Sequence, residues 1–217
     1  MHAMSLCGLC ISYAIVVVAG STTAWAAKDD FNRAKLGKNW VVSSGSLSIS
    51  KHQLQGSDMA VGYDTKSAND TTVSATVYLH GANLEYGAVT SGNMPTGNYA
   101  FVKIQSSDGK FGYGAFYVGN NGAGLFFQLD APIPSPATLK LSFCGDVATM
   151  KIKSADGIQK YSYDYGQTFG TGGGLGTYGP VSLDNYKSKP GGCTDGGGAK
   201  IIRSSNARDP LAPPRSR

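Results

Sequence analysis

Apolar and polar residues alternate along much of this chain, and the alternation is interrupted at short intervals by Gly, Asn, Asp and Pro. In segments 72–79 and 99–105 every second residue is apolar, and the residues between them are mostly polar or aromatic. A period of two residues is typical of a strand with one face against a core and one toward solvent. Between residues 29 and 186 no segment shows a convincing 3.6-residue apolar period. The sequence therefore predicts an all-β protein.

The strands are expected to be short and numerous. The clearest hairpin joins segments 139–143 and 148–152 through a turn at Cys144-Gly145-Asp146. Further strands are predicted at 46–50, 59–63, 72–79, 86–91, 99–105, 110–118, 124–129, 158–164 and 176–186. About a dozen such strands are typical of a two-sheet sandwich. Residues 166–179 include seven glycines and are expected to form a mobile loop, whereas Trp40 is expected to pack inside.

The first residues have the features of a secretory leader. An apolar run from Leu6 to Ala19 is followed by Ala24-Trp25-Ala26, with small residues at the two positions that signal peptidase reads. The run is too short to span a bilayer comfortably. Residues 1–26 are thus predicted to be a signal peptide, so that the mature chain is secreted to the periplasm or the exterior and has no transmembrane segment.

Leader removal leaves Cys144 and Cys193 of the four cysteines, which is an even pair in an oxidising compartment. A disulfide between them is the favoured prediction. The alternative is two free thiols, because Cys193 lies in a glycine-rich segment that need not be held near Cys144.

The formal net charge of +5 is concentrated at the C-terminus, where five basic residues and one acidic residue follow residue 199. The rest of the mature chain is close to neutral. Basic residues on a Pro-containing tail give no case for a nucleic-acid partner, which would need a basic patch on the folded domain. We expect the compact domain to span residues 27–188 and residues 189–217 to form a disordered Gly- and Pro-rich tail.

Two acidic and aromatic segments bracket the strands, Asp29-Asp30-Phe31-Asn32-Arg33 near the start and Val181-Ser182-Leu183-Asp184-Asn185-Tyr186 near the end. With the strands between them, they resemble the concanavalin A-like lectin/glucanase superfamily, in its laminin-G-like branch, whose first and last strands pair. The resemblance implies an antiparallel jelly-roll sandwich of two sheets. It also implies that Asp29, Asp30 and Asp184 could hold a structural calcium ion. Hydrogen bonds that tie the strand ends together are the alternative role for these carboxylates.

Catalytic motifs are missing. Glu85 is the only glutamate in the chain, so the Glu-x-Asp-x-x-Glu strand of the superfamily's glucanases is absent. Glycosidases need two carboxyl groups across the scissile bond, and most aspartates here fall at expected turns. His52 and His80 lie in no hydrolytic or zinc motif. The segment 174–179 matches Gly-x-Gly-x-x-Gly, but a strand is expected after it where a dinucleotide site needs a helix. No catalytic residue is predicted, and the sequence leans against an enzyme.

The outward rows of the strands are the candidate binding surface. Aromatic rings pack on the C–H faces of sugars, and polar side chains serve the hydroxyl groups. Tyrosine is equally a good strand former, so the pattern is not specific. The residues predicted to bind ligand are Tyr78, Tyr99, Lys103, Gln105, Tyr113, Tyr117 and Gln128.

A secreted, non-catalytic glycan-binding sandwich is the leading hypothesis. One alternative is a sugar-active enzyme of the same fold, either a glycoside hydrolase or a lyase. The other is a structural or adhesive protein of the cell envelope without a small ligand. A cleft lined by Tyr, Gln and Asp would favour binding, whereas a flat apolar patch would favour assembly.

Overall fold

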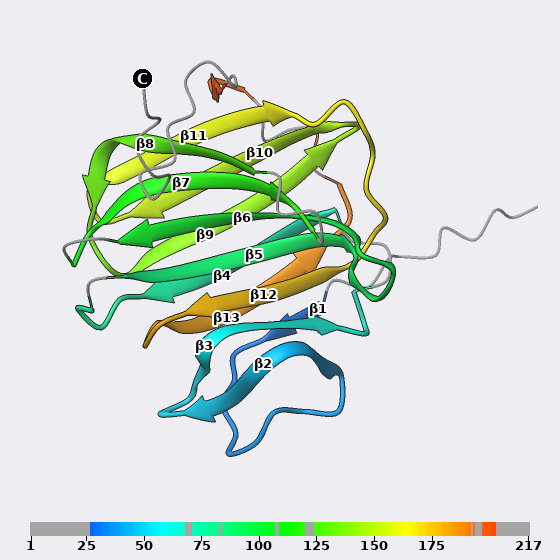
Figure 1. Ribbon diagram of the computed structural model, residues 1–217, viewed down its shortest axis with the longest axis vertical. Helices are drawn as coiled ribbons and strands as arrows, with labels where there is room; N and C mark the ends of the chain where they lie inside the picture. Colours follow the sequence, from blue (N-terminus) through cyan, green and yellow to red (C-terminus); the bar gives the residue numbers. More distant parts are fainter. Residues whose placement is uncertain are drawn as a thin grey trace, which may run out of the picture.

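The computed structural model describes residues 27–67, 71–82, 84–106, 109–119, 124–191, 193 and 197–202, except for the side chains of residues 57 and 58. The regular structure in these ranges is almost entirely strand, which confirms the predicted all-β class (Figure 1). The predicted signal peptide lies outside the described residues. In the described part of the chain, no helix has the length and apolar character needed to cross a membrane.

The strands follow one another with short connections, as the punctuation of the sequence predicts. Residues 94–96 form the 3-10 helix η1, between β5 and β6. The strands are β1 (Ala27–Asp29), β2 (Trp40–Ser50), β3 (Gln53–Asp64), β4 (Thr72–Tyr78), β5 (Glu85–Asn93), β6 (Asn98–Ser106), β7 (Phe111–Val118), β8 (Gly124–Ile133), β9 (Ala137–Cys144), β10 (Val147–Ser154), β11 (Gly157–Asp164), β12 (Gly173–Tyr178), β13 (Ser182–Lys189) and β14 (Lys200–Ile201).

The strands form a sandwich of two layers. Their hydrogen-bonded order is β14-β11-β10-β9-β4-β13-β3-β12-β5-β6-β7-β8, while β1 pairs with β13 and β2 with β3. The path bends between β13 and β3, which share only a short stretch of pairing, so that β5 and β6 come to lie over β4 and β9 (Figure 1). We call the layer from β3 to β8 the front sheet and the layer from β14 to β13 the back sheet. The two bracketing segments of the sequence pair as the resemblance implied, since β1 is hydrogen-bonded to β13.

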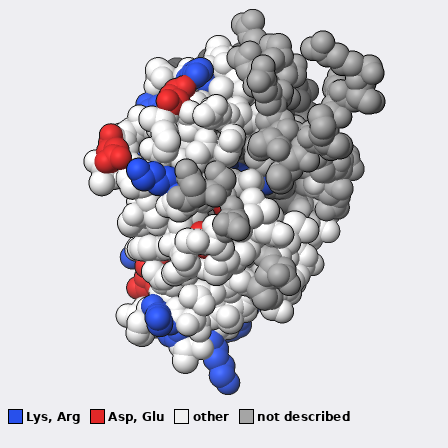
Figure 2. Space-filling model, turned by 60° about the vertical axis from the view of Figure 1, so that its left-hand side comes forward, with Lys and Arg blue, Asp and Glu red and all other residues white. Residues whose placement is uncertain are grey.

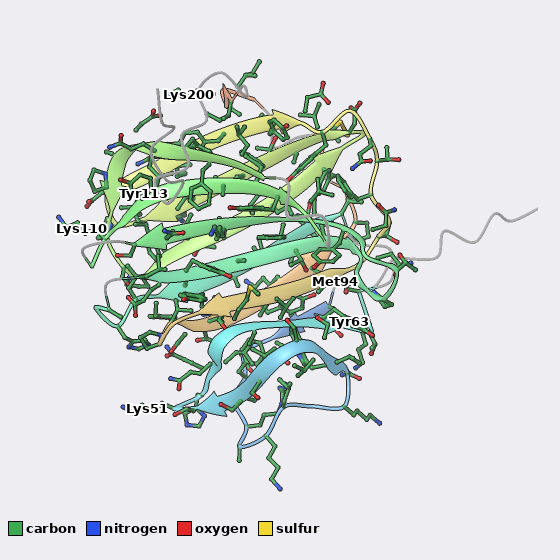
Figure 3. The ribbon with its side chains drawn as sticks, viewed as in Figure 1. Lys51, Tyr63, Met94, Lys110, Tyr113 and Lys200 are labelled. Carbon is green, nitrogen blue, oxygen red and sulfur yellow. A yellow bond between two sulfur atoms is a disulfide. The ribbon has the colours of Figure 1, made fainter. Side chains whose placement is uncertain are left out.

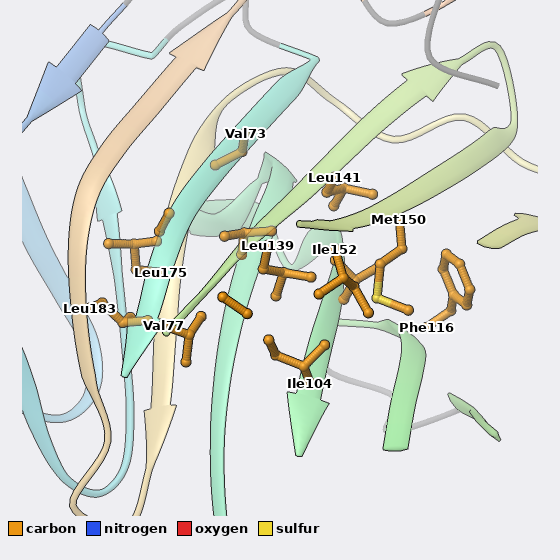
Figure 4. Close-up of a cluster of buried hydrophobic side chains, with 14 of the residues drawn as sticks. Val73, Val77, Ile104, Phe116, Leu139, Leu141, Met150, Ile152, Leu175 and Leu183 are labelled. Carbon is orange, nitrogen blue, oxygen red and sulfur yellow. The ribbon is translucent and has the colours of Figure 1, made fainter. Parts of the chain in front are cut away.

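The alternating apolar rows of the two sheets meet in the core. Val102 and Ile104 of β6 are fully buried, as are Leu139 and Leu141 of β9 (Figure 4). Gly114 of β7 leaves room for this packing, since a Cβ atom there would lie 2.6 Å from the Phe127 ring. The other face of each strand therefore remains available to form a surface.

Part of the glycine-rich segment forms a strand where a mobile loop was expected. Residues 173–178 form β12, a central strand of the front sheet between β3 and β5. A Cβ at Gly173 would lie 2.5 Å from the Tyr186 hydroxyl, and one at Gly174 would lie 2.5 Å from the carbonyl oxygen of Gly62. Glycine is needed in this strand because neighbouring atoms approach the backbone closely. The single strand predicted at 176–186 is two strands, β12 and β13, separated at Gly179.

The compact part of the chain extends beyond the predicted end at residue 188. Cys144 and Cys193 form the predicted disulfide, with Cα atoms 4.5 Å apart. Beyond it, β14 pairs in parallel with β11, and Ile202 is buried. Lys200 forms an ion pair with Asp130. The disulfide and these contacts therefore hold Cys193 and residues 200–202 to the back sheet, where a disordered tail was expected from residue 189. Residues 192, 194–196 and 203–217 lie outside the described residues.

Candidate functional site

A groove of about 380 Å³ lies on the outward face of the front sheet. Its lining comes largely from the side chains of β12, β5, β6 and β7 that project away from the core. Figure 3 shows this face, with Tyr113 projecting from β7. The residues that line the groove are Ser44, Met59, Val61, Tyr86, Ala88, Thr90, Tyr99, Phe101, Lys103, Tyr117, Gly119 and Gly176.

The floor of the groove is a row of small residues that crosses the strands. Gly176 is paired with Ala88, Ala88 with Lys103, and Lys103 with Ala115. Directly paired residues project from the same face of a sheet, so these four form one line across β12, β5, β6 and β7. Gly176 and Ala88 keep the floor low on one side of Lys103, whereas Ala115 on the other side is fully buried. The groove is thus a consequence of side-chain size along one row.

Aromatic pairs stand on the two rows beside this floor. Tyr86 stacks on Tyr178, with ring centroids 5.3 Å apart and planes 12° from parallel. On the other side of the floor, Phe101 stacks on Tyr117 at 4.9 Å and 7°. Tyr99 lies on the next row along β6, with its ring centroid 6.4 Å from that of Phe101. The groove therefore has flat aromatic surfaces on both sides.

The Tyr117 ring occupies the space beside Gly124, its neighbour across the strands, because this glycine has no side chain. A Cβ atom at Gly124 would lie 2.2 Å from the Tyr117 ring, so any larger residue there would push the ring away. The edge of Phe126 meets the same ring in a T-shaped contact at 5.8 Å. These contacts hold Tyr117 in position to receive a flat ligand.

Lys103 occupies the middle of the groove and is 8% exposed. Its Nζ atom lies 4.3 Å from the Tyr86 ring centroid, 4.4 Å from that of Phe126 and 5.2 Å from that of Tyr117. The negative faces of aromatic rings attract a cation, and this attraction is stronger where water is excluded. The three rings thus stabilise a positive charge between the two aromatic pairs.

Two tyrosines of the groove, Tyr86 and Tyr99, are hydrogen-bond donors over the whole physiological pH range. Burial raises the pKa of Tyr86 to about 12, and the nearby Tyr178 adds to the rise. Burial also raises the pKa of Tyr99. Both hydroxyl groups consequently keep their protons at neutral pH and can donate to a ligand.

The structure brings six of the seven predicted ligand-binding residues to one face. Tyr99, Lys103 and Tyr117 line the groove itself. The next row pairs Gln105 with Tyr113 and Tyr113 with Gln128, which places these three beside the groove on the same face. Their exposure differs, since Gln105 is buried, Tyr113 is half-buried and Gln128 is exposed.

Tyr78 does not share this face, so the expectation of a common face is wrong for it. It lies at the end of β4 in the back sheet, where it is paired with Ser182 of β13. Alternation along β4 does predict that Tyr78 points away from the core. It cannot tell which of the two sheets contains the strand, because that depends on long-range pairing.

Several groove residues were not among the predicted ligand-binding residues. Phe101 has the same alternation as Tyr99 and Lys103, so the pattern of β6 contained the signal for it. Tyr86 likewise begins a segment that was predicted to be a strand. Tyr178, which stacks on Tyr86 beside the groove, lies where two predictions overlapped, the glycine-rich loop at 166–179 and the strand at 176–186.

The acidic residues near the terminal strands form a network of hydrogen bonds. The Asp29 carboxylate accepts from both terminal nitrogens of Arg33, from Trp40 Nε1 at 2.8 Å and from the Phe31 amide at 2.8 Å. Burial alone would raise the pKa of Asp29, but these donors outweigh it and lower the pKa below its usual value. Trp40 is buried as predicted, between the rings of Phe31 and Tyr186.

The same network does not fit a calcium ion. Both oxygens of Asp29 are engaged by Arg33, and a cation would have to break this ion pair to gain them. Burial raises the pKa of Asp184, and the charges of Asp30 and Asp29 add to the rise, so the three carboxylates do influence one another. Within the described residues, no three His, Cys, Asp or Glu side chains are placed to hold a metal ion. The arrangement fits the alternative role, in which the carboxylates tie the strand ends together.

Glu85 is placed as a structural residue. It is fully buried, and its carboxylate accepts hydrogen bonds from the backbone amides of His80 at 2.9 Å and Gly81 at 3.1 Å. His80 itself contacts the Ser182 hydroxyl at 2.7 Å, away from the groove. The described lining of the groove contains no carboxylate.

A second cavity, of about 600 Å³, lies beside β1 and β13. Its lining includes Lys28, Asp29, Arg33, Lys38 and Asn185. The Asp29–Arg33 ion pair occupies part of this lining. Because charged side chains there bind one another and no stacked aromatic pair lines the cavity among the described residues, the groove is the stronger candidate site.

Comparison with known proteins supports the fold. No family model matches the chain, and no curated protein matches it. The carbohydrate binding module CBM66 from Bacillus subtilis superposes with a TM-score of 0.55 and 18% identity, covering 70% of this chain and 96% of that one. A prokaryotic beta-1,3-1,4-glucanase (lichenase) derived from a mouse hindgut metagenome gives a TM-score of 0.56 at 9% identity, covering 76% and 99%.

A third structure, a protein of unknown function with a galectin-like fold from Bacillus subtilis, gives a TM-score of 0.50 at 12% identity, covering 75% of this chain and 94% of that one. These likenesses confirm the concanavalin A-like jelly-roll sandwich that the bracketing segments implied. At such low identities they define the fold class alone.

Proposed function

We propose that this protein is a non-catalytic glycan-binding sandwich and that the ligand occupies the groove of the front sheet. The observation that carries the proposal is the pair of stacked aromatic surfaces on either side of a low floor. Carbohydrate-binding and glucan-cleaving proteins among the structural neighbours use the same fold, which makes a sugar ligand plausible.

The dimensions and chemistry of the groove suit a sugar. Its volume of about 380 Å³ falls in the range of roughly 300–1,000 Å³ that is usual for small-ligand sites. Pyranose rings present C–H groups that pack on aromatic faces, while their hydroxyls need donors and acceptors nearby. The protonated hydroxyl groups of Tyr86 and Tyr99 supply donors at the two sides of the groove.

Binding is favoured over cleavage by the residues of the lining. Glycosidases place two carboxyl groups within roughly 5–9.5 Å of each other across the bond. The described lining of the groove holds no carboxylate, and Glu85 is committed to backbone hydrogen bonds. We therefore place no catalytic residue in the groove.

We also propose that the protein is exported. The Cys144–Cys193 disulfide is characteristic of proteins that fold in an oxidising compartment. The predicted leader, with cleavage after Ala26, agrees with such a location.

Replacement of Tyr117 tests the proposed function directly. Tyr117→Ala removes one half of a stacked pair and should weaken retention on a bound polysaccharide about tenfold, since it deletes an aromatic platform. Affinity electrophoresis on a broad polysaccharide panel measures the effect. Tyr78→Ala is the matched control, because it removes a half-buried tyrosine from the back sheet and should leave retention unchanged.

Circular dichroism and melting curves of the two variants separate loss of binding from loss of folding. If the wild-type protein is retarded by no polysaccharide of the panel, glycan binding is wrong and the structural or adhesive alternative takes its place. If Tyr78→Ala weakens retention as much as Tyr117→Ala does, the ligand does not bind in the groove.

A further inference from the structure

We infer that the groove selects an acidic glycan, one that carries carboxylate or sulfate groups, and that Lys103 recognises the acidic group. This inference rests on the proposed function and deepens it. The starting observation is the place of Lys103 in the middle of the floor, between two aromatic pairs, where a cation is unusual.

The charge of the lining favours an anion. Lys103 lines the groove and carries a formal positive charge at neutral pH. A hollow with low-dielectric walls strengthens the interaction between a charge inside it and an incoming ion of opposite sign. The stacked rings form such walls. A ligand with an acidic group is therefore attracted to the floor of the groove.

The geometry places Lys103 within reach of any ligand that touches the aromatic pairs. Its Nζ atom is 4.3 Å from the centroid of Tyr86 on one side and 5.2 Å from that of Tyr117 on the other. The small residues Ala88 and Gly176 leave space above the floor on one side of the lysine. A sugar seated against either wall thus brings its substituents to the ammonium group.

The chemistry distinguishes an acidic sugar from a neutral one. An ammonium group can also donate to a neutral hydroxyl, but a carboxylate or sulfate adds the attraction between two opposite full charges, which is strong where water is excluded. Cation–π contacts offset part of the cost of burying the charge and hold it on the floor. Lys103 is thereby a specificity-determining residue, while the tyrosines supply contacts that acidic and neutral sugars share.

Matched ligands that differ only in charge test the inference on the wild-type chain. Polygalacturonate and its methyl-esterified form share one sugar backbone, and dextran sulfate and dextran share another. Affinity electrophoresis and calorimetry should show binding at least about tenfold tighter to one charged form than to its neutral partner. The pectin pair tests the carboxylate, and the dextran pair tests the sulfate.

Variants assign the preference to the lysine. Lys103→Met keeps the length of the side chain and removes the charge, so the preference for the acidic form should disappear. Lys103→Arg retains the charge and should preserve most of that preference. Lys153→Met is the matched control, because it removes one exposed lysine from β10 of the back sheet and should change nothing.

The outcomes separate this inference from the proposed function. Equal or weaker binding of both acidic forms, together with a Tyr117-dependent retention on neutral glycans, overturns the acidic preference and leaves glycan binding standing. An acidic preference that survives in Lys103→Met overturns the role of Lys103. Absence of binding to every glycan contradicts the proposed function and this inference with it. The comparison of matched ligands needs no variant, so it tests the acidic preference even if Lys103→Met does not fold.

Discussion

At the scale of single residues, the carboxylates of Asp29 and Glu85 have well-defined structural partners. Asp29 collects donors from Arg33, Trp40 and the backbone, and thereby connects the first strand to the loop that follows it. Glu85 accepts from two successive backbone amides in the same manner. Carboxylates of this kind stabilise the fold, and neither of the two lines the groove.

The pH dependence of stability should reveal the role of Asp29. Its pKa is lowered in the folded protein, so its contribution is present above the unfolded value of about 3.9. That contribution is lost as the pH falls through the lower folded value. Asp29→Asn should cost about 1–3 kcal/mol at pH 7 and flatten the loss of stability below pH 4.

Urea unfolding of the wild type and of Asp29→Asn between pH 2 and pH 7 measures this difference. Asp130→Asn is a suitable control, because Asp130 pairs with Lys200 on the surface and such pairs contribute little. If the free energy of unfolding falls equally steeply with pH in the wild type and in Asp29→Asn, another group controls the acid transition.

Added calcium should leave the melting temperature unchanged, whereas a clear rise would show that Asp29 exchanges Arg33 for the ion.

At the scale of elements, alternation along the strands predicted more than the turns and loops did. A strand with one buried row, such as β6, is recognisable because its own sequence decides which residues face the core. The glycine-rich β12 was recognised only in its second half, as part of the strand predicted at 176–186, because its stability comes from neighbours on both sides rather than from its own side chains. Tyr78 illustrates the same limit, since the sheet to which β4 belongs is decided by distant partners.

Two glycines of β12 provide a matched test of this view. Gly173 faces the core, and a Cβ there would meet the Tyr186 hydroxyl at 2.5 Å, so Gly173→Ala should destabilise the protein by about 1–3 kcal/mol. Gly176 lies on the groove floor, where a Cβ would make ordinary contact at 3.4 Å with Ala88. Gly176→Ala should therefore leave stability within about 0.5 kcal/mol of the wild type.

Denaturant unfolding of both variants measures the difference between them, and ligand retention of Gly176→Ala shows whether the narrower floor obstructs the groove. Similar destabilisation by the two substitutions would mean that the intrinsic preferences of glycine and alanine, and not the close contacts, decide the effect.

At the scale of the whole molecule, one hydrogen-bonded path of strands folds over itself to enclose the core. The sequence predicted this class because many short alternating strands cannot bury their apolar rows except against a second sheet. Charged side chains are scattered over a mostly uncharged surface on the face that Figure 2 shows. The position of the groove could not be predicted, since it depends on the register that aligns Gly176, Ala88, Lys103 and Ala115 across four strands.

The mature chain should begin at Ala27 and carry no free thiol. Export would remove Cys7 and Cys10 with the leader, and Cys144 and Cys193 are joined. Intact-mass analysis of the exported protein, with and without reduction and alkylation, measures both the N-terminal residue and the number of free thiols. Reduction should also lower the melting temperature, since a bridge across 49 residues contributes roughly 4 kcal/mol in the chain-entropy model. Retention of Met1, or alkylation before reduction, would contradict this expectation.

The short strand β14 has a consequence for the behaviour of the protein in concentrated solution. It pairs with β11 at the margin of the back sheet, where the hydrogen-bonding groups of an exposed strand would otherwise offer a template to another molecule. The disulfide at Cys193 keeps this protective segment close to the margin that it covers. Reduction would therefore do more than loosen the chain. It would expose the unpaired backbone groups of β11 and promote self-association into β-rich aggregates.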